Sequence, residues 1–154
     1  MTADDSSERR VLDEMLCFSM YAASRATTQA YRRLLQPWGL TYPQYLVLVE
    51  LWSRGPLSVR ELGDDLALDS GTLSPLLRRM DAAGILTRRR EQNDGRVVTV
   101  ALTARGLALR NEMSSVPAEL GRCMGVDLPA ARAMVEDLRR LTDTVNRANL
   151  AAAS

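Results

Sequence analysis

The fold of this protein is decided by residues 58–86, SVRELGDDLALDSGTLSPLLRRMDAAGIL, and by residues 87–103, TRRREQNDGRVVTVALT. The first stretch has the pattern of two short helices joined by a tight turn, and the second has the pattern of an arginine-lined β-hairpin. A helix pair followed directly by a basic β-ribbon is the layout of a DNA-binding unit, in which one helix enters the major groove and the ribbon lies beside it.

Local signals mark where these elements begin. Ser58 and Glu61 form the S-x-x-E pattern of a capping box, and Asp69 or Ser70 caps the helix that follows. After that helix, β-branched residues favour extended chain on either side of a turn at Asn93-Asp94-Gly95. The order helix, helix, hairpin is therefore predicted from short-range signals alone.

The second helix of the pair has one apolar and one polar face. Apolar residues at spacing i, i+3, i+4 and i+7 are predicted to pack inward: Leu73, Leu76, Leu77 and Met80. The other face begins with small hydroxyl residues around a glycine and ends with two arginines, which suit contacts to phosphates and base edges. At the hairpin tip, Arg96 is placed to enter a minor groove with Asp94 fixing its direction. The predicted DNA-contacting residues are Asp69, Ser70, Gly71, Thr72, Ser74, Pro75, Arg78, Arg79, Arg88, Asp94 and Arg96.

The distribution of charge supports a nucleic-acid partner better than its total does. The formal net charge is only +1, but seven arginines and three acids lie between Arg78 and Arg105. The alternative is a solvated, charge-rich hairpin on an enzyme. The presence of both a helix pair and a basic ribbon favours the DNA-binding interpretation.

Helical patterns precede this unit. A long pattern over residues 11–36 is halted by Pro37. Thr41 and Gln44 then form a second capping box, which opens an apolar core helix that extends to about Ser53.

Further helical patterns follow it. Thr103 caps a helix that we expect to run to about Val116 and to be broken by Pro117, and residues 118–126 give no clear pattern. A last helix from Pro129 has an apolar stripe that suits helix–helix packing, including packing across a dimer: Met134, Leu138, Leu141 and Val145.

Composition excludes several classes of function. A chain of 154 residues with 46% hydrophobic and 25% charged residues is typical of one soluble globular domain. No apolar run is long enough for a transmembrane helix and the start of the chain is polar, so we expect a cytoplasmic protein without a membrane partner. Histidine is absent and the two cysteines form no CxxC pair. We therefore expect no metal site, no cofactor and no histidine-based catalysis.

Cys17 lies in the helical segment LDEMLCFSMYAASRATTQAY (residues 12–31) among tyrosines. Tyr21 is one turn along the same face, whereas Tyr31 lies about 21 Å farther along the helix axis. Tyr31 therefore cannot touch Cys17 within one helix. If two such helices cross antiparallel in a dimer, Tyr31 of one chain can reach the cysteine of the other, and Tyr42 can join it. The alternative interpretation of Cys17 is a small buried hydrophobic residue.

The chain resembles the MarR family of bacterial transcription regulators. The resemblance rests on LDSGTLSPLLRRMDAAGIL (residues 68–86) and on the tip NDGR (residues 93–96), a form of that family's acidic-x-Arg motif. It implies a mainly α fold with a small β-hairpin wing, a single winged helix-turn-helix domain over residues 1–154. Residues 41–103 would bind DNA. The helices in residues 1–36 and 118–154 would form a homodimer on a pseudo-palindromic double-stranded operator.

Within that family, LCFSMYAASR, QAYRRLL and LTYPQYL resemble the organic hydroperoxide resistance regulators. This resemblance implies that Cys17 is the reactive cysteine and that Tyr31 and Tyr42 hydrogen-bond to it across the dimer. Phenol O–H donors can stabilise a thiolate without adding charge. Organic hydroperoxide would oxidise Cys17 to a sulfenic acid and the repressor would release its operator.

Two points stay open at this stage. Cys123 is either structural or, as the two-cysteine members of that group imply, the thiol that resolves the sulfenic acid; otherwise a low-molecular-weight thiol would cap it. Two other functions compete: a repressor released by non-covalent binding of a small phenolic or lipophilic ligand, and a thiol peroxidase. The enzyme is disfavoured because no cationic residue lies near Cys17 on its helix face, so we predict that the chain is not an enzyme.

Overall fold

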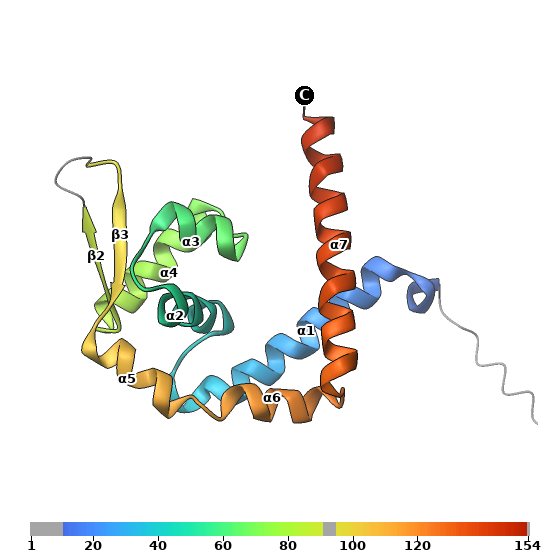
Figure 1. Cartoon of the computed structure of the whole chain (residues 1–154), viewed down its shortest axis with the longest axis horizontal. Helices are drawn as coiled ribbons and strands as arrows, with labels where there is room; N and C mark the ends of the chain where they lie inside the picture. Colours follow the sequence, from blue (N-terminus) through green and yellow to red (C-terminus); the bar gives the residue numbers. More distant parts are fainter. Residues whose placement is uncertain (1–10, 91–94, 154) are drawn as a thin grey trace, which may run out of the picture. The chain divides into compact units, whose positions relative to one another are not determined.

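The computed structural model describes residues 11–90 and 95–153. The chain divides into two compact units, Met1–Val116 and Pro117–Ser154. Its elements, drawn in Figure 1, are in order η1 (Val11–Glu14), α1 (Leu16–Leu35), η2 (Gln36–Trp38), α2 (Tyr42–Arg54), β1 (Leu57–Ser58), α3 (Val59–Leu66), α4 (Ser70–Ala82), β2 (Leu86–Arg90), β3 (Val98–Leu102), α5 (Ala104–Glu112), α6 (Val116–Met124) and α7 (Leu128–Ala152). The predicted fold class, mainly helical with a small β-hairpin, is confirmed.

The predicted helix starts are present as side-chain caps. The Thr41 side chain accepts a hydrogen bond from the backbone N–H of Gln44, and the Gln44 side chain accepts one in return from the backbone N–H of Thr41. Ser58 and Glu61 make the same reciprocal pair at the start of α3. Each cap satisfies N–H groups that the first turn of a helix leaves without partners, which contributes about 1 kcal/mol to helix stability.

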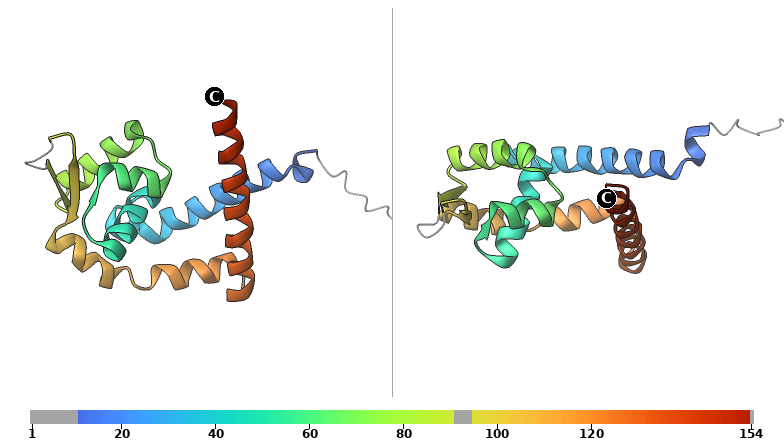
Figure 2. Two further views of the ribbon diagram at one scale, coloured as in Figure 1. Left: turned by 45° about the horizontal axis from the view of Figure 1, so that its top comes forward. Right: turned by 90° about the horizontal axis from the view of Figure 1, so that it is seen from above.

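The core of the first unit forms where α2, α4 and the sheet meet. The four inward residues predicted for α4 are all buried, with Leu77 and Met80 fully so. From α2, Val47 and Leu48 are likewise fully buried. Figure 2 shows α2, α3 and α4 packed together, with the hairpin beside them. Because each buried leucine contributes about 1.5–3 kcal/mol, this core holds α4 firmly in place.

The sheet has three antiparallel strands in the order β1-β3-β2. The hairpin strands β2 and β3 pair as predicted, with Leu86 opposite Leu102 and Arg88 opposite Val100. The sequence did not indicate β1. It is two residues long and forms only because Leu57 pairs with Val100 of β3, which ties the start of α3 to the base of the hairpin.

Two predicted helix boundaries are wrong. The helix capped by Thr103 ends at Glu112, and Pro117 does not break it but is the second residue of the next helix, α6. Proline is tolerated there because N–H groups of the first turn have no partner within the helix. The long helical pattern from residue 11 is also divided, into η1 and α1, at Met15.

Residues 118–124, which gave no clear pattern, continue α6, and α7 starts at Leu128 behind an Asp127 cap. Among the residues that the structure describes, no helix is long and apolar enough to cross a membrane.

Candidate nucleic-acid interface and tyrosine cluster

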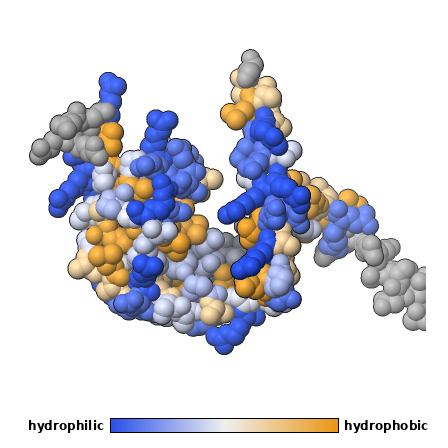
Figure 3. Space-filling view, in the orientation of Figure 1, coloured by the Kyte–Doolittle hydropathy of each residue, from blue (hydrophilic) through white to orange (hydrophobic). Residues whose placement is uncertain are grey.

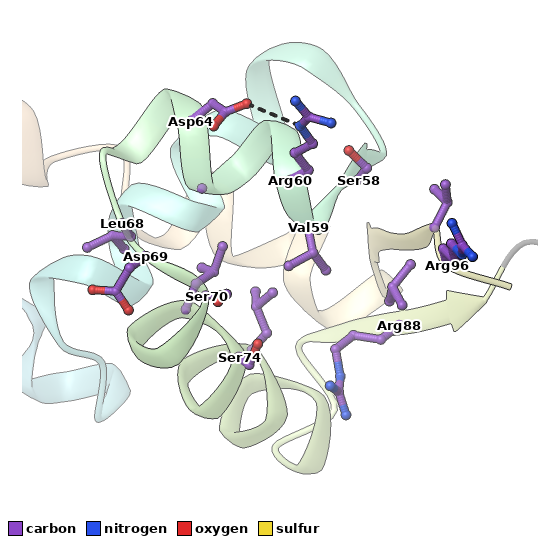
Figure 4. A pocket seen from close by; sticks show the side chains of 15 residues that line it. Ser58, Val59, Arg60, Asp64, Leu68, Asp69, Ser70, Ser74, Arg88 and Arg96 are labelled. Atoms are coloured by element: carbon purple, nitrogen blue, oxygen red, sulfur yellow. Dashed lines mark ion pairs between the residues drawn. The ribbon is translucent and has the colours of Figure 1, made fainter. Parts of the chain in front are cut away.

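A groove of about 770 Å³ lies between α3, the first half of α4 and the hairpin. Figure 4 shows the residues that line it, with Ser70 and Ser74 reaching in from α4 and Arg88 and Arg96 from the hairpin side. The structure thus brings residues from the two predicted DNA-contacting segments to one concave surface.

Asp69 lines this groove and has a structural role there. Its carboxylate accepts hydrogen bonds from the Thr72 N–H at 2.8 Å and from the Thr72 hydroxyl at 3.2 Å. Asp69 is therefore the cap of α4, and it fixes the direction in which the N-terminus of that helix points. A helix N-terminus that presents N–H groups toward a surface attracts phosphate.

The polar face of α4 is open to solvent. Gly71, Arg78 and Arg79 are exposed, and Pro75 is half-buried between them. Among the described residues, neither arginine takes part in an ion pair. Their guanidinium groups remain available for bidentate hydrogen bonds to phosphate or to guanine.

Arg88 is paired within the protein. Its Nε lies 3.1 Å from Oδ2 of Asp81, in the last turn of α4, with the two side chains 30% and 36% exposed. This ion pair holds the hairpin against α4, while the guanidinium still borders the groove. Arg96 lies at the hairpin end of the groove and is exposed. Asp94 lies outside the described residues, so the predicted Asp94–Arg96 arrangement remains a prediction.

Another ion pair along the groove is exposed to solvent and therefore weak. Arg60 and Asp64 of α3 are 3.9 Å apart, with 91% and 78% of their side chains exposed. Figure 3 shows hydrophilic side chains over the visible surface of α3 and along the hairpin. Because such exposed pairs contribute less than about 1 kcal/mol, a phosphate can compete for Arg60.

A cluster of aromatic rings joins α1 to α2. The rings of Tyr31 and Tyr42 stack with their centroids 4.0 Å apart. Tyr45 packs on Tyr31 at 5.6 Å, and Trp52 meets Tyr45 edge-on at 6.1 Å. The structure therefore brings together the two tyrosines singled out from the sequence. Tyr45, which was not singled out, follows Tyr42 at helical spacing i+3, and that spacing was the available signal.

Burial controls the protonation of this cluster. Burial, with a smaller contribution from the neighbouring Tyr42 and Tyr45, raises the pKa of Tyr31 to about 12. Burial also raises the pKa of Tyr45. At neutral pH both phenols are protonated, so each has an O–H group to donate.

Cys17 lies on the exposed surface of α1, one turn before Tyr21. Tyr21 accepts a hydrogen bond from Arg25 at 3.0 Å and is 56% exposed. Within this helix Tyr31 is 14 residues from Cys17, about 21 Å along the axis, so one chain cannot bring the two together. Cys123 is exposed in α6. In the part of the chain that the structure describes, no cluster of acidic or cysteine residues suits a metal ion.

The helix pair, its grooved face and the adjoining basic hairpin define a winged helix-turn-helix DNA-binding protein. The sequence pattern of the MarR family matches residues 40–98. The chain is 42% identical to the transcriptional regulator TtmR of Methylorubrum extorquens, over 95% of this chain and 75% of that protein. It is 41% identical to the organic hydroperoxide resistance transcriptional regulator of Bacillus subtilis, over 84% of each.

Solved structures of similar proteins support the same assignment. AbfR in its reduced form bound to DNA is 32% identical and superposes with a TM-score of 0.73, over 84% of this chain and 91% of that one. The overoxidised form of AbfR, also bound to DNA, gives a TM-score of 0.72, and the form with a disulfide gives 0.59. The chain belongs to the MarR family and is a transcriptional regulator. Its relatives are named as regulators, not enzymes, as predicted.

Proposed function

We propose that this chain is a repressor that binds its operator as a reduced homodimer and releases it when organic hydroperoxide oxidises Cys17. The stacked pair Tyr31 and Tyr42 carries the proposal, because it places two phenol groups, one of them half-buried and protonated, beside each other near the protein surface. The named hydroperoxide regulator of Bacillus subtilis and the redox forms of AbfR support it.

A homodimer would bring together residues that lie too far apart within one chain. Val11 in η1 and Leu16 at the start of α1 are 79% and 63% exposed. In α7, Met134, Leu138 and Val145 are each about half exposed along the stripe predicted from the sequence. Exposed apolar residues at this spacing suit a second copy of the same chain, and dimers are typical of the family. Antiparallel crossing of the two α1 helices would bring Cys17 of the partner subunit to Tyr31 and Tyr42.

The proposed chemistry is a two-electron oxidation of sulfur. The Cys17 thiolate attacks the outer oxygen of the hydroperoxide, the O–O bond breaks, and the alkoxide leaves and takes up a proton to become an alcohol. The phenol O–H groups stabilise the thiolate before the reaction. The sulfenic acid then condenses with a second thiol, which forms a disulfide and releases water.

We infer that the disulfide, and not the sulfenic acid, releases the operator. The overoxidised form of AbfR has been solved bound to DNA, so overoxidation does not by itself prevent that relative from binding. A disulfide imposes a short fixed distance between two chain segments, whereas both α4 helices of a dimer must match the operator spacing at once. Cys123 of the partner subunit is the proposed second thiol.

Gel shifts on the operator test the proposal. Wild-type protein should release DNA after one equivalent of organic hydroperoxide, and thiol reductant should restore binding. Cys17→Ser should stay bound under the same treatment. Cys123→Ser is the matched control: it should release only when a low-molecular-weight thiol is added. Release of the Cys17→Ser protein by peroxide would overturn the covalent mechanism.

A second candidate function is release by a bound small molecule with no bond to Cys17. A groove of about 680 Å³ between α1 and the start of α2 favours it, because that volume suits a small organic ligand. The two candidates differ in one observable. Under the second, Cys17→Ser responds to the ligand as the wild-type protein does.

A further inference from the structure

Both tryptophans of this chain donate their indole N–H to the same helix, α5. Trp52 of α2 donates to the backbone oxygen of Gly106, in the first turn of α5, at 2.9 Å. Trp38 of η2 donates to the carboxylate of Glu112, the last residue of α5, at 3.0 Å. The two ends of one short helix are therefore bonded to two different segments, α2 and the turn that joins α1 to α2.

Each of these hydrogen bonds has a second contact beside it. The Arg110 guanidinium of α5 donates to the backbone oxygen of Trp52 at 3.4 Å. At the other end of α5, Arg105 forms an ion pair with Glu112. Hydrogen bonds from Arg105 and then from Trp38 hold the pKa of Glu112 below its usual range, so at neutral pH both carboxylate oxygens are free to accept. Two groups thus fix each end of α5.

The same tryptophans adjoin the tyrosine cluster. Trp38 lies in the segment between the helices that contain Tyr31 and Tyr42. Trp52 meets Tyr45 edge-on with ring centroids 6.1 Å apart, and Tyr45 packs on Tyr31 at 5.6 Å. Because closely packed side chains transmit small displacements, a change in the stacking of Tyr31 on Tyr42 is felt at both tryptophans.

The start of α5 is fixed to the base of the hairpin. The Thr103 hydroxyl accepts the N–H of Gly106 at 3.1 Å and lies 2.9 Å from the backbone oxygen of Ile85, to which it donates. A Cβ on Gly106 would collide with that same oxygen, so α5 and the start of the hairpin have no room to slide past each other. In Figure 1, α5 follows directly on β3. A displacement of α5 therefore displaces the hairpin.

We propose that Trp38 and Trp52 are positioning residues for operator binding: by fixing both ends of α5, they couple the tyrosine cluster to the DNA-binding hairpin. The inference rests on the proposed function only for its natural trigger, in which oxidation of the partner subunit's Cys17 disturbs Tyr31 and Tyr42. The coupling itself belongs to the reduced protein and is testable without an oxidant.

A double-mutant cycle on operator affinity tests the coupling. Tyr42→Leu removes the ring that stacks on Tyr31. Its effect is measured by fluorescence anisotropy on the reduced dimer, in the wild-type background and in a Trp38→Phe, Trp52→Phe background, which keeps an aromatic ring at each position but has neither N–H donor. We expect Tyr42→Leu to weaken operator binding about fivefold in the wild-type background, at the low end for coupled sites, and less than about twofold in the other.

Arg78→Gln is the matched control for this cycle. Arg78 is exposed on α4 and is predicted to contact DNA directly. Its substitution should therefore weaken operator binding by the same factor in both backgrounds. The proposal is overturned if Tyr42→Leu also has equal factors in the two backgrounds, or if it has no effect in the wild type.

Two substitutions at Glu112 test the Trp38 end of α5 without removing a ring. Glu112→Gln keeps a side-chain oxygen that can accept the indole N–H, whereas Glu112→Leu does not. In proton–nitrogen correlation spectra, the Trp38 indole signal should exchange faster with solvent in Glu112→Leu only, with the Trp52 signal as internal reference. Glu112→Leu should also reduce the effect of Tyr42→Leu, and Glu112→Gln should preserve it. Equal effects of Tyr42→Leu in these two backgrounds would contradict the role of Trp38.

Oxidation separates this inference from the proposed function. Under organic hydroperoxide, Cys17 should be oxidised equally in the wild type and in the Trp38→Phe, Trp52→Phe variant, as followed by mass spectrometry, while the variant releases less operator. If the wild type releases no operator but the cycle shows coupling, the redox function fails and the coupling stands. If both proteins release operator equally and the cycle is additive, the coupling fails and the redox function stands.

Discussion

Gly106 offers a sharp test of how the wing is attached to the core. It is a buried residue of α5, and a Cβ placed on it would collide with the carbonyl oxygen of Ile85 and lie 3.0 Å from Cδ2 of Leu102. The leucine can rotate, but the Ile85 oxygen cannot move freely, because it accepts hydrogen bonds from the N–H and hydroxyl of Thr103. The Gly106 oxygen also accepts the indole N–H of Trp52 at 2.9 Å.

Gly106→Ala should therefore destabilise the protein by about 2–4 kcal/mol. Overpacking of a close contact costs about 1–3 kcal/mol, and displacement of the Trp52 hydrogen bond adds about 1 kcal/mol. Urea denaturation at one fixed protein concentration measures the change.

Gly121→Ala is the matched control. Gly121 lies inside α6, and a Cβ there would meet nothing within 4 Å. Alanine has the higher helix propensity, so this variant should gain about 0.5–1 kcal/mol. The same chemical change should thus have opposite signs at the two sites. If Gly106→Ala unfolds within about 0.5 kcal/mol of the wild type, the described packing at the wing base is wrong.

Three more predictions concern the interface and the tyrosine cluster. Because the pKa of Tyr31 is raised from 10.0 to about 12, folding favours its protonated form. The stability that this phenol contributes below pH 10 should therefore be lost as the pH rises toward 12. In an alkaline unfolding titration, Tyr31→Phe should flatten that loss. Asp81→Asn should change the free energy of unfolding by less than about 1 kcal/mol, since the ion pair of Asp81 with Arg88 is about a third exposed. It should nevertheless weaken operator binding about fivefold in fluorescence anisotropy, because the hairpin is then no longer paired to α4. Unchanged affinity would contradict this role. Arg78→Gln should lower the slope of log affinity against log salt by about 1, and an unchanged slope would place Arg78 away from phosphate.

The parts of the fold that depend on near neighbours in sequence could be predicted. The capping boxes at Thr41 and Ser58 need only the residue three positions later, and both are present. The apolar stripe of α4 was predictable for the same reason, because spacing along one helix decides which residues share a face. The tyrosine pair was anticipated from residue type and family resemblance, and the structure places Tyr31 on Tyr42.

Features that depend on distant partners could not be predicted. β1 exists because Leu57 meets β3, some forty residues later, and its own two residues have no strand pattern. Arg88 looked available for DNA, but its pairing with Asp81 depends on how the hairpin turns back over α4. Pro117 illustrates a different limit: proline ends one helix or begins another, and the sequence did not decide between these.

The most direct test of the proposed switch measures the disulfide fraction and the bound DNA fraction in the same titration. Operator complex is titrated with organic hydroperoxide in small steps; at each step mass spectrometry gives the fraction of Cys17 in a disulfide, and anisotropy gives the fraction of operator still bound. The account predicts that the bound fraction falls in proportion to the disulfide and recovers when reductant is added. Operator that stays bound while Cys17 is fully in a disulfide would contradict it.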